Sequence, residues 1–212
     1  MIALSSIDLT QFIVTWYGQP DRSDSRATDC DQLPEPLRAW HELAERYSFP
    51  LLGNKRFTPP NEIKAHDGKM VFLTDQSDAI WGYDPGDEMS VYEGRIYGDW
   101  VKLTESLSEF LVHNALGEAA YNAPFTRTCD SVPNHRMADI LTPMTEVSVG
   151  AWKWPAENHR IFLGSNIVAE VGPGLTDGST LDDNSGCSEV QIGSTHASAL
   201  AYLDQIPDLD WF

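Results

Sequence analysis

The sequence predicts an α+β protein in which a mixed or antiparallel sheet is flanked by helices. Three segments, at residues 8–17, 33–47 and 104–123, repeat apolar residues at the helical spacing. Between the last two, residues 67–101 change to short apolar runs bounded by turn residues, which is typical of strands. The regular strand–helix alternation of a parallel doubly wound sheet is missing. A hydrophobic content of 42%, with 10% aromatic residues, indicates a packed globule.

The first two helices have recognisable ends. Asp8 is an expected N-cap for the segment at 8–17, and Gly18 follows its last apolar residue. In the segment at 33–47, Pro36 suits a first helical turn. Both segments place their apolar residues on one face, so both helices are expected to cover a core.

A β-hairpin is predicted at residues 67–83, because two apolar runs there are separated and preceded by turn residues. Two further short strands are expected at 90–93 and 95–101, with Gly94 between them. Thr104 is the expected cap of a long helix that ends before Pro124.

The C-terminal part predicts strands at 161–163, 167–171 and 190–192, followed by a last helix capped by Ser194. Residues 125–150 carry no clear pattern. We therefore expect a core at residues 1–123 and a C-terminal strand–strand–strand–helix extension at residues 124–212, packed on that core.

Charge is the most unusual property of the sequence. The chain has 32 acidic and 14 basic residues, a net charge of −18, and no Lys or Arg follows Arg160. Residues 1–123 have 20 acids and 10 bases, and residues 124–212 have 12 and 4, so both parts are acidic. Such a field repels nucleic acid and anionic membranes and attracts basic proteins. Solubility or adaptation to salt is the alternative explanation.

No metal, cofactor or catalytic motif is found in the sequence. The six histidines are scattered, and the acidic loop beginning at Asp182 lacks the glycine and glutamate that a calcium-binding EF-hand loop needs. Phosphate-binding glycine loops and the G-x-S-x-G nucleophile motif do not occur. Carboxylate pairs are too abundant to be specific. We therefore expect a non-enzyme without cofactor.

Location in a reducing cytoplasm is expected from the cysteines and the N-terminus. Cys30, Cys129 and Cys187 lie far apart and are odd in number, which does not suit a disulfide framework. The first basic residue is Arg22, and the apolar run at 12–14 is too short for a signal peptide or a membrane span. The oligomeric state is left open.

Three segments resemble the SUKH superfamily, which includes yeast cell-wall-assembly regulators and many bacterial immunity proteins. The matching features are Leu33-Pro34 before an amphipathic helix, a strand with Val71-Phe72, the turn at Gln76, a strand with Ile80-Trp81-Gly82, and a helix that begins near Leu107. Residues 152–155, 160–164 and 189–206 resemble the tails of longer actinobacterial members. The resemblance implies an α+β protein-binding scaffold, typically an immunity protein that blocks a toxin, often a nuclease, and it supplies no catalytic residue.

The hypothesis is therefore an intracellular immunity or antitoxin-type protein that binds a basic toxin domain through acidic turns. A regulatory scaffold without a toxin is one alternative. A small-ligand protein or enzyme with a pocket between two lobes is another. The expected partner-binding residues are acidic residues of turns and a neighbouring aromatic residue: Trp81, Asp84, Asp87, Glu88, Glu93 and Asp99, with Asp177, Asp182 and Asp183 as a second group.

Overall fold

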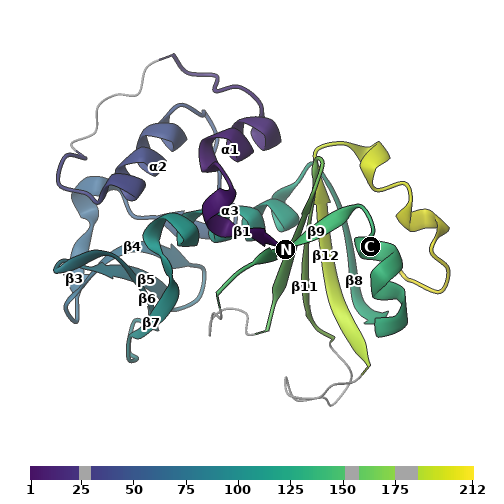
Figure 1. The fold of residues 1–212 in the computed structure, drawn as a ribbon. Helices are drawn as coiled ribbons and strands as arrows, with labels where there is room; N and C mark the ends of the chain where they lie inside the picture. The colour runs from purple at the N-terminus through teal and green to yellow at the C-terminus, as the bar shows by residue number, and fades with distance from the viewer. Residues whose placement is uncertain (24–29, 151–157, 175–185) are drawn as a thin grey trace. The chain divides into compact units, whose positions relative to one another are not determined.

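The computed structural model describes residues 1–23, 30–150, 158–174 and 186–212 of the chain, which divides into two compact units. The N-terminal unit consists of Ile7–Ala115 and Gly150–Pro155. The C-terminal unit consists of Met1–Ser6, Leu116–Val149 and Ala156–Phe212. Each unit contains one sheet with helical segments, so the predicted α+β class is confirmed (Figure 1). The expected division into a core at residues 1–123 and an extension at residues 124–212 stays a prediction.

The helices begin where local hydrogen bonds satisfy their first N–H groups. Asp8 caps α1, because its Oδ1 accepts a hydrogen bond from the N–H of Gln11 at 2.9 Å. The long helix α3 begins after Ser106 and not at Thr104, because the Glu109 carboxylate accepts the N–H of Ser106 at 2.9 Å in a capping box. The described α-helices are α1 (Leu9–Tyr17), α2 (Glu35–Glu45), α3 (Leu107–Asn122) and α4 (Met137–Leu141).

The sheet of the N-terminal unit is antiparallel, in the order β2-β4-β5-β6-β7, with β3 also paired to β4. The predicted hairpin at 67–83 is confirmed by the pairing of β4 with β5. Asp67 and Gly68, both with positive φ, form the tight turn before it, between β3 and β4. The strands are β2 (Lys55–Phe57), β3 (Lys64–His66), β4 (Lys69–Asp75), β5 (Ala79–Asp84), β6 (Asp87–Arg95) and β7 (Val101–Ser106).

Aromatic rings connect α2, this sheet and α3 in the core of the N-terminal unit. The ring of Trp40 lies 4.7 Å from that of Phe57, which lies 6.2 Å from Phe72. Phe72 in turn meets Phe110 of α3 edge-on at 5.7 Å. The face of the sheet that carries Phe72 and contacts α3 is called the inner face below, and the opposite one the outer face.

The expected break at Gly94 is wrong, because β6 runs through it without interruption. Gly94 is needed for space: a Cβ there would lie 3.0 Å from the indole of Trp100. Gly82 on the neighbouring strand β5 has the same neighbour, at 3.3 Å. Two glycines on adjacent strands therefore make room for one aromatic side chain on the outer face.

The sheet of the C-terminal unit has the order β1-β9-β10-β11-β12-β8 and is antiparallel except for the pair β1–β9. The predicted strand pair at 161–171 is confirmed by β10 and β11. Residues 125–150, which have no clear sequence pattern, contain β8, α4 and β9. The strands are β1 (Ile2–Ala3), β8 (Phe125–Pro133), β9 (Met144–Ser148), β10 (Arg160–Gly164), β11 (Ile167–Pro173) and β12 (Cys187–Ser194).

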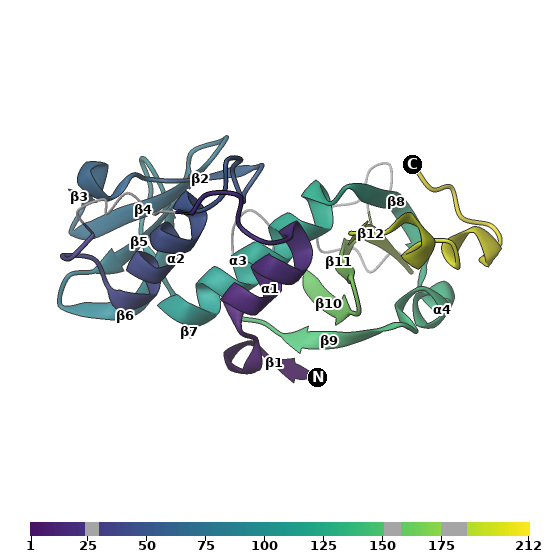
Figure 2. The same ribbon diagram turned by 90° about the horizontal axis from the view of Figure 1, so that it is seen from above.

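The two faces of this sheet are covered differently. One face forms a hydrophobic core with α4 and the C-terminal residues, which lie beside β8 and β12 in both ribbon views (Figure 1 and Figure 2). On the other face, the last turns of α3 lie close to β12, where Gly193 leaves room for the helix backbone. The Nε2 amide of Gln191 donates a hydrogen bond to the carbonyl of Ala120 at 3.1 Å and fixes this approach.

The expected last helix behind Ser194 is wrong. Ser194 ends β12, and its hydroxyl donates to the carbonyl of Asn166 at 2.6 Å and accepts the N–H of His196 at 3.1 Å. These bonds use the hydroxyl in a local turn, so it does not cap an α-helix. Two 3₁₀ turns follow instead, Ala197–Ala199 and Leu203–Gln205.

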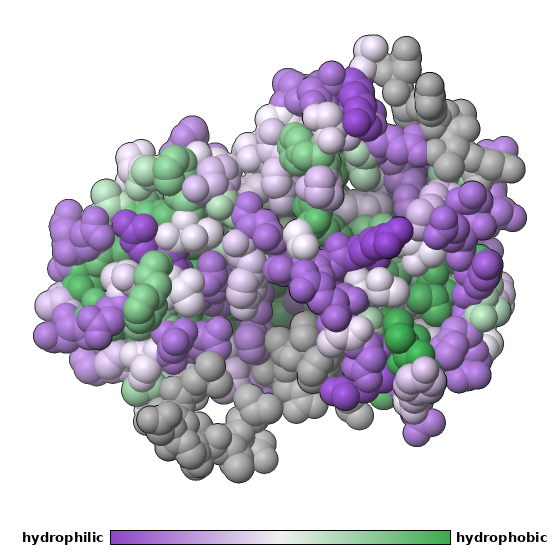
Figure 3. Space-filling model, turned by 180° about the vertical axis from the view of Figure 1, so that it is seen from behind, coloured by the Kyte–Doolittle hydropathy of each residue, from purple (hydrophilic) through white to green (hydrophobic). Residues whose placement is uncertain are grey.

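Helices long and apolar enough to cross a membrane are not found among the described residues. On the face drawn in Figure 3, hydrophobic residues appear as separate patches among hydrophilic ones. On a surface of this kind, an apolar pocket stands out from scattered hydrophobic residues as a candidate interaction site.

Candidate functional site

The outer face of the N-terminal sheet carries a candidate site. Cross-strand pairing places Val71 opposite Gly82, Gly82 opposite Tyr92, and Tyr92 opposite Lys102. Residues that are directly opposite in a ladder share one face. Trp81 packs against Phe110 of α3, so the next residue of β5, Gly82, faces the other way. These positions therefore lie on the outer face, where the Trp100 indole covers Gly82.

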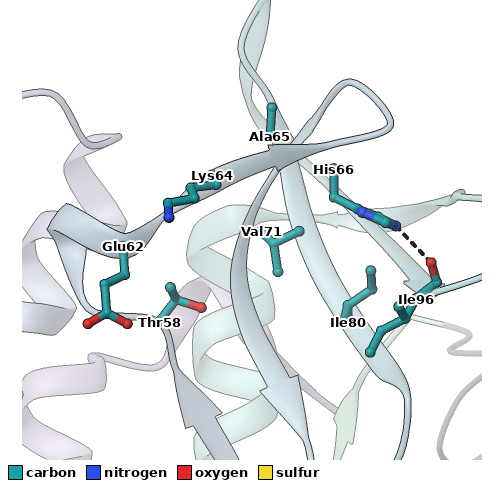
Figure 4. A pocket seen from close by; sticks show the side chains of 8 residues that line it. All are labelled: Thr58, Glu62, Lys64, Ala65, His66, Val71, Ile80 and Ile96. Atoms are coloured by element: carbon teal, nitrogen blue, oxygen red, sulfur yellow. Dashed lines mark hydrogen bonds between the residues drawn. The ribbon is translucent and has the colours of Figure 1, made fainter.

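A pocket of about 300 Å³ opens on this side, where β3 borders β4 (Figure 4). Val71 and Ile80 form an apolar floor, and Ile80 is only 4% exposed. In Figure 4, Glu62 and Lys64 lie at one end and His66 lies at the other, beside Ile96. An apolar floor with a few polar groups at the rim is the usual composition of a binding pocket. The lining residues are Thr58, Glu62, Lys64, Ala65, His66, Val71, Ile80 and Ile96.

The turn between β6 and β7 borders this pocket and exposes apolar side chains. Tyr97 is 96% exposed and Ile96 is 41% exposed. The turn is nevertheless fixed, because the N–H of Ile96 donates to the carbonyl of Asp78 at 3.0 Å. His66 also holds it, with its Nε2 2.9 Å from the carbonyl oxygen of Ile96. An exposed Tyr on a fixed turn is suited to contact a protein partner.

Two of the expected partner-binding residues, Trp81 and Glu93, do not lie on an accessible surface. Trp81 is fully buried on the inner face, with its ring 6.2 Å from that of Phe110. Glu93 is directly opposite Trp81 in the ladder and is 3% exposed. The alternation of side chains along each strand points both away from solvent, so their assignment to a contact surface is wrong.

Two other expected residues, Asp84 and Asp87, are engaged with lysines. Lys69 Nζ lies 2.6 Å from Asp84 Oδ2, and this hydrogen bond lowers the pKa of the Asp84 carboxyl. Lys102 Nζ lies 3.4 Å from Asp87 Oδ2. The Lys69 ammonium also sits 4.0 Å from the centre of the Tyr92 ring. At this end of the outer face, each of these two acidic residues is therefore paired with a lysine.

The remaining expected residues divide into two groups. Glu88 and Asp99 are exposed, and Asp99 lies in the same turn as Tyr97, next to the pocket. Asp177, Asp182 and Asp183 lie outside the described residues. Asp99 is therefore the one described residue of the expected set in the turn that borders the pocket, and none of the set lines the pocket itself.

The pocket residues themselves were missed by the sequence analysis. A usable signal was present at residues 96–100, where two aromatic residues and an isoleucine occupy a turn that would ordinarily be polar. Glu62, Lys64 and His66 give no signal, because single charged residues in short exposed segments are common.

Buried polar groups also occur on the inner face of the N-terminal sheet. His113 Nδ1 lies 2.7 Å from Glu105 Oε1, and both residues are buried. The N–H of Gly150 donates to the same carboxylate oxygen at 2.6 Å. A carboxylate that orients an imidazole occurs in general-base catalysis, but His113 is not among the pocket residues. This pair therefore fixes β7 against α3.

A second cluster of ionisable groups lies on the C-terminal sheet. His159 Nδ1 is 2.6 Å from Glu170 Oε1. Burial, and then the charges of Asp130 and Glu170, raise the pKa of Glu189, while His159 opposes them. Burial and the charge of Glu170 raise the pKa of Tyr121 as well. The cluster therefore carries more negative charge than the single histidine offsets.

We expect Glu189→Gln to stabilise the protein at pH 7 and to have no such effect at about pH 4. The folded-state pKa of Glu189 is raised, so ionisation costs the folded state free energy once the pH exceeds the unfolded pKa of about 4.3. Below that pH both states hold the proton and the cost is absent. Urea unfolding at the two pH values measures the difference, with exposed Glu88→Gln as the control. An equal gain at both pH values would contradict this account.

Among the described residues, no group of three or more His, Cys, Asp or Glu side chains is arranged to hold a metal ion. Comparisons of the chain with protein-family models, with curated proteins and with solved structures find no match. The candidate site is therefore defined by its own geometry: an apolar pocket, a polar rim and an exposed aromatic turn.

Proposed function

We propose that this protein is a non-catalytic module that binds a basic protein partner through the outer face of its N-terminal sheet. The observation that carries the proposal is Tyr97, which is 96% exposed on a fixed turn beside an apolar pocket. A large, rigid aromatic side chain gives contact area at a small entropic cost, and tyrosine is enriched among the residues that dominate binding energy.

The charge of the chain supports a basic partner. A net charge of −18 attracts cationic proteins over long distances and speeds their encounter. The acid excess is present in both halves of the chain, so it does not depend on a single patch. Within this class, we propose an immunity-type inhibitor that neutralises a toxin domain, for instance a nuclease. The resemblance to the SUKH superfamily and the acidity support this choice, because a nuclease site that accepts polyanions is complementary to carboxylates.

The proposal is tested by isolating the partner and measuring its association with the full chain. The gene neighbourhood supplies the candidate partner, since an immunity protein is expected beside its toxin gene. We expect the association rate to fall about tenfold or more between about 0.05 M and about 0.5 M salt, because screening shortens the reach of exposed charges. Tyr97→Ala should weaken the complex by about 2 kcal/mol, a value typical of a dominant contact.

The control is Phe125→Ala in the C-terminal unit, where an aromatic residue with 42% exposure is removed from another surface. This variant should bind as the wild type does. A partner that is acidic, or whose association rate ignores salt, would contradict the proposal. Equal losses in Tyr97→Ala and Phe125→Ala would place the contact elsewhere.

A further inference from the structure

We infer that the pocket on the outer face binds an apolar side chain of the partner that is flanked by a Lys or Arg residue. The inference rests on the proposed function and adds the chemistry of the recognised segment. It is drawn from the shape of the pocket, from the charges left unpaired around it, and from the bonds that hold its walls in place.

The shape accounts for the apolar part of the ligand. Val71 and Ile80 form the floor and Ile96 forms a wall, so an aliphatic or aromatic side chain would remove apolar surface from water on several sides. Lys64 of β3 is opposite Val71 in the ladder and shares its face, whereas Ala65 is opposite Met70 and its side chain points away from the floor (Figure 4). A volume of about 300 Å³ is small for a ligand pocket, so one side chain with its neighbours in an extended segment suits it better than a helix.

The distribution of ion pairs accounts for the basic part. Three bases of this sheet are close to acids and offset them: Lys69 with Asp84, Lys102 with Asp87, and Arg95 with Asp78 at 3.8 Å. The exposed acids next to the pocket are not offset in this way. Glu62 and Asp99 make no ion pair with a described residue, and Asp67 is near only His66, at 3.6 Å.

Lys64 is the one exposed Lys or Arg among the residues that line the pocket in the described part of the chain. Three acids against one base leave an excess of negative charge around the apolar floor. A guanidinium or ammonium group next to the inserted side chain would therefore find an unpaired carboxylate at Glu62, which lines the pocket, or at Asp67 and Asp99 in the turns that follow His66 and Ile96.

The walls of the pocket are fixed before the ligand binds. His66 holds Ile96, and the carbonyl of His66 accepts the indole N–H of Trp100 at 3.2 Å. These bonds join β3 to the turn between β6 and β7, although the two segments are distant in sequence. Binding therefore costs little rearrangement, which favours a defined ligand over a loose one.

The test uses the immobilised full chain and a displayed library of random peptides, followed by synthesis of the enriched consensus peptide. We expect consensus peptides with an apolar residue next to Lys or Arg. Val71→Phe, which fills the pocket from its floor, should weaken the consensus peptide by about tenfold or more. Glu62→Lys should weaken it several-fold, whereas Glu88→Lys, the matched charge reversal outside the pocket, should change it less than about twofold.

Thermal unfolding of each variant establishes that it is folded before its affinity is compared. Enriched peptides that are acidic, that lack an apolar residue, or that bind Val71→Phe as well as the wild type would overturn the inference, and so would the absence of enrichment. If the wild type self-associates and Val71→Phe does not, the occupant is a second copy and the inference is wrong. The proposed function fails separately, if no basic partner binds the protein. It stands if the partner binds Val71→Phe as tightly as the wild type.

Discussion

Gly193→Ala is expected to destabilise the C-terminal unit by about 3 kcal/mol, at the upper end of what overpacking costs. The added Cβ would lie 2.5 Å from the carbonyl oxygen of Ala119 and 2.7 Å from that of Ala120. Both atoms belong to the backbone of α3, so no side-chain rotation relieves the clash. Calorimetry should show a thermal midpoint lower by about 6 to 12 °C.

The matched control is Gly98→Ala in the turn between β6 and β7. There the nearest atom to an added Cβ is Arg95 Cβ at 3.4 Å, an ordinary contact. This variant should unfold within about 0.5 kcal/mol of the wild type, as surface substitutions usually do. Equal losses in the two variants would show that the closeness of α3 to β12 is not what requires glycine at position 193.

His41→Leu is expected to protect the protein against acid, by up to about 3 kcal/mol at pH 4 relative to neutral pH. Burial lowers the pKa of His41 to about 4, from 6.5 for an accessible imidazole. In the unfolded chain His41 therefore binds a proton below about pH 6.5, whereas in the folded protein it binds one only below about pH 4. Over this window the wild type loses stability as the pH falls, and a leucine at this position does not.

The environment of His41 explains the direction of the pKa shift. The residue lies in α2 with 8% of its surface exposed, its ring meets Phe57 edge-on at 5.9 Å, and its Nε2 has no hydrogen-bond partner among the described residues. Urea unfolding of wild type and variant between pH 4 and 7 measures the effect, with exposed His135→Leu as the control. A difference between wild type and His41→Leu that is constant over this range would refute the assignment.

Much of the N-terminal unit could be predicted from its sequence, because its signals are local. Asp8 caps a helix wherever apolar residues follow at helical spacing, and Asp67-Gly68 forms a tight turn whatever surrounds it. The errors concern tertiary structure. The sequence predicts a strand end at Gly94, whereas the glycine is required by Trp100, six residues further along the chain. The helix expected behind Ser194 was lost because that hydroxyl bonds to Asn166 on a neighbouring hairpin.

The candidate site was less accessible to sequence reasoning than the fold. Acidic residues in turns are expected from the sequence to form the contact surface. A carboxylate attracts a basic partner over a distance only if no neighbouring base neutralises it. The partners of Asp84 and Asp87 lie on other strands and become visible only in the folded sheet. The assignment of Trp81 and Glu93 to the contact surface is wrong for a second reason. The face to which a strand residue points depends on the register of the strand, which composition does not specify.

The Trp100 side chain, packed over two glycines beside the pocket, gives the protein an intrinsic optical reporter. Its indole is partly accessible, whereas Trp16, Trp40 and Trp81 in the same unit are buried. An occupant of the pocket would change the polarity around this one fluorophore and leave those three unaltered. The difference in emission between the wild type and Trp100→Phe would then follow occupancy in real time, with no dye attached to either molecule.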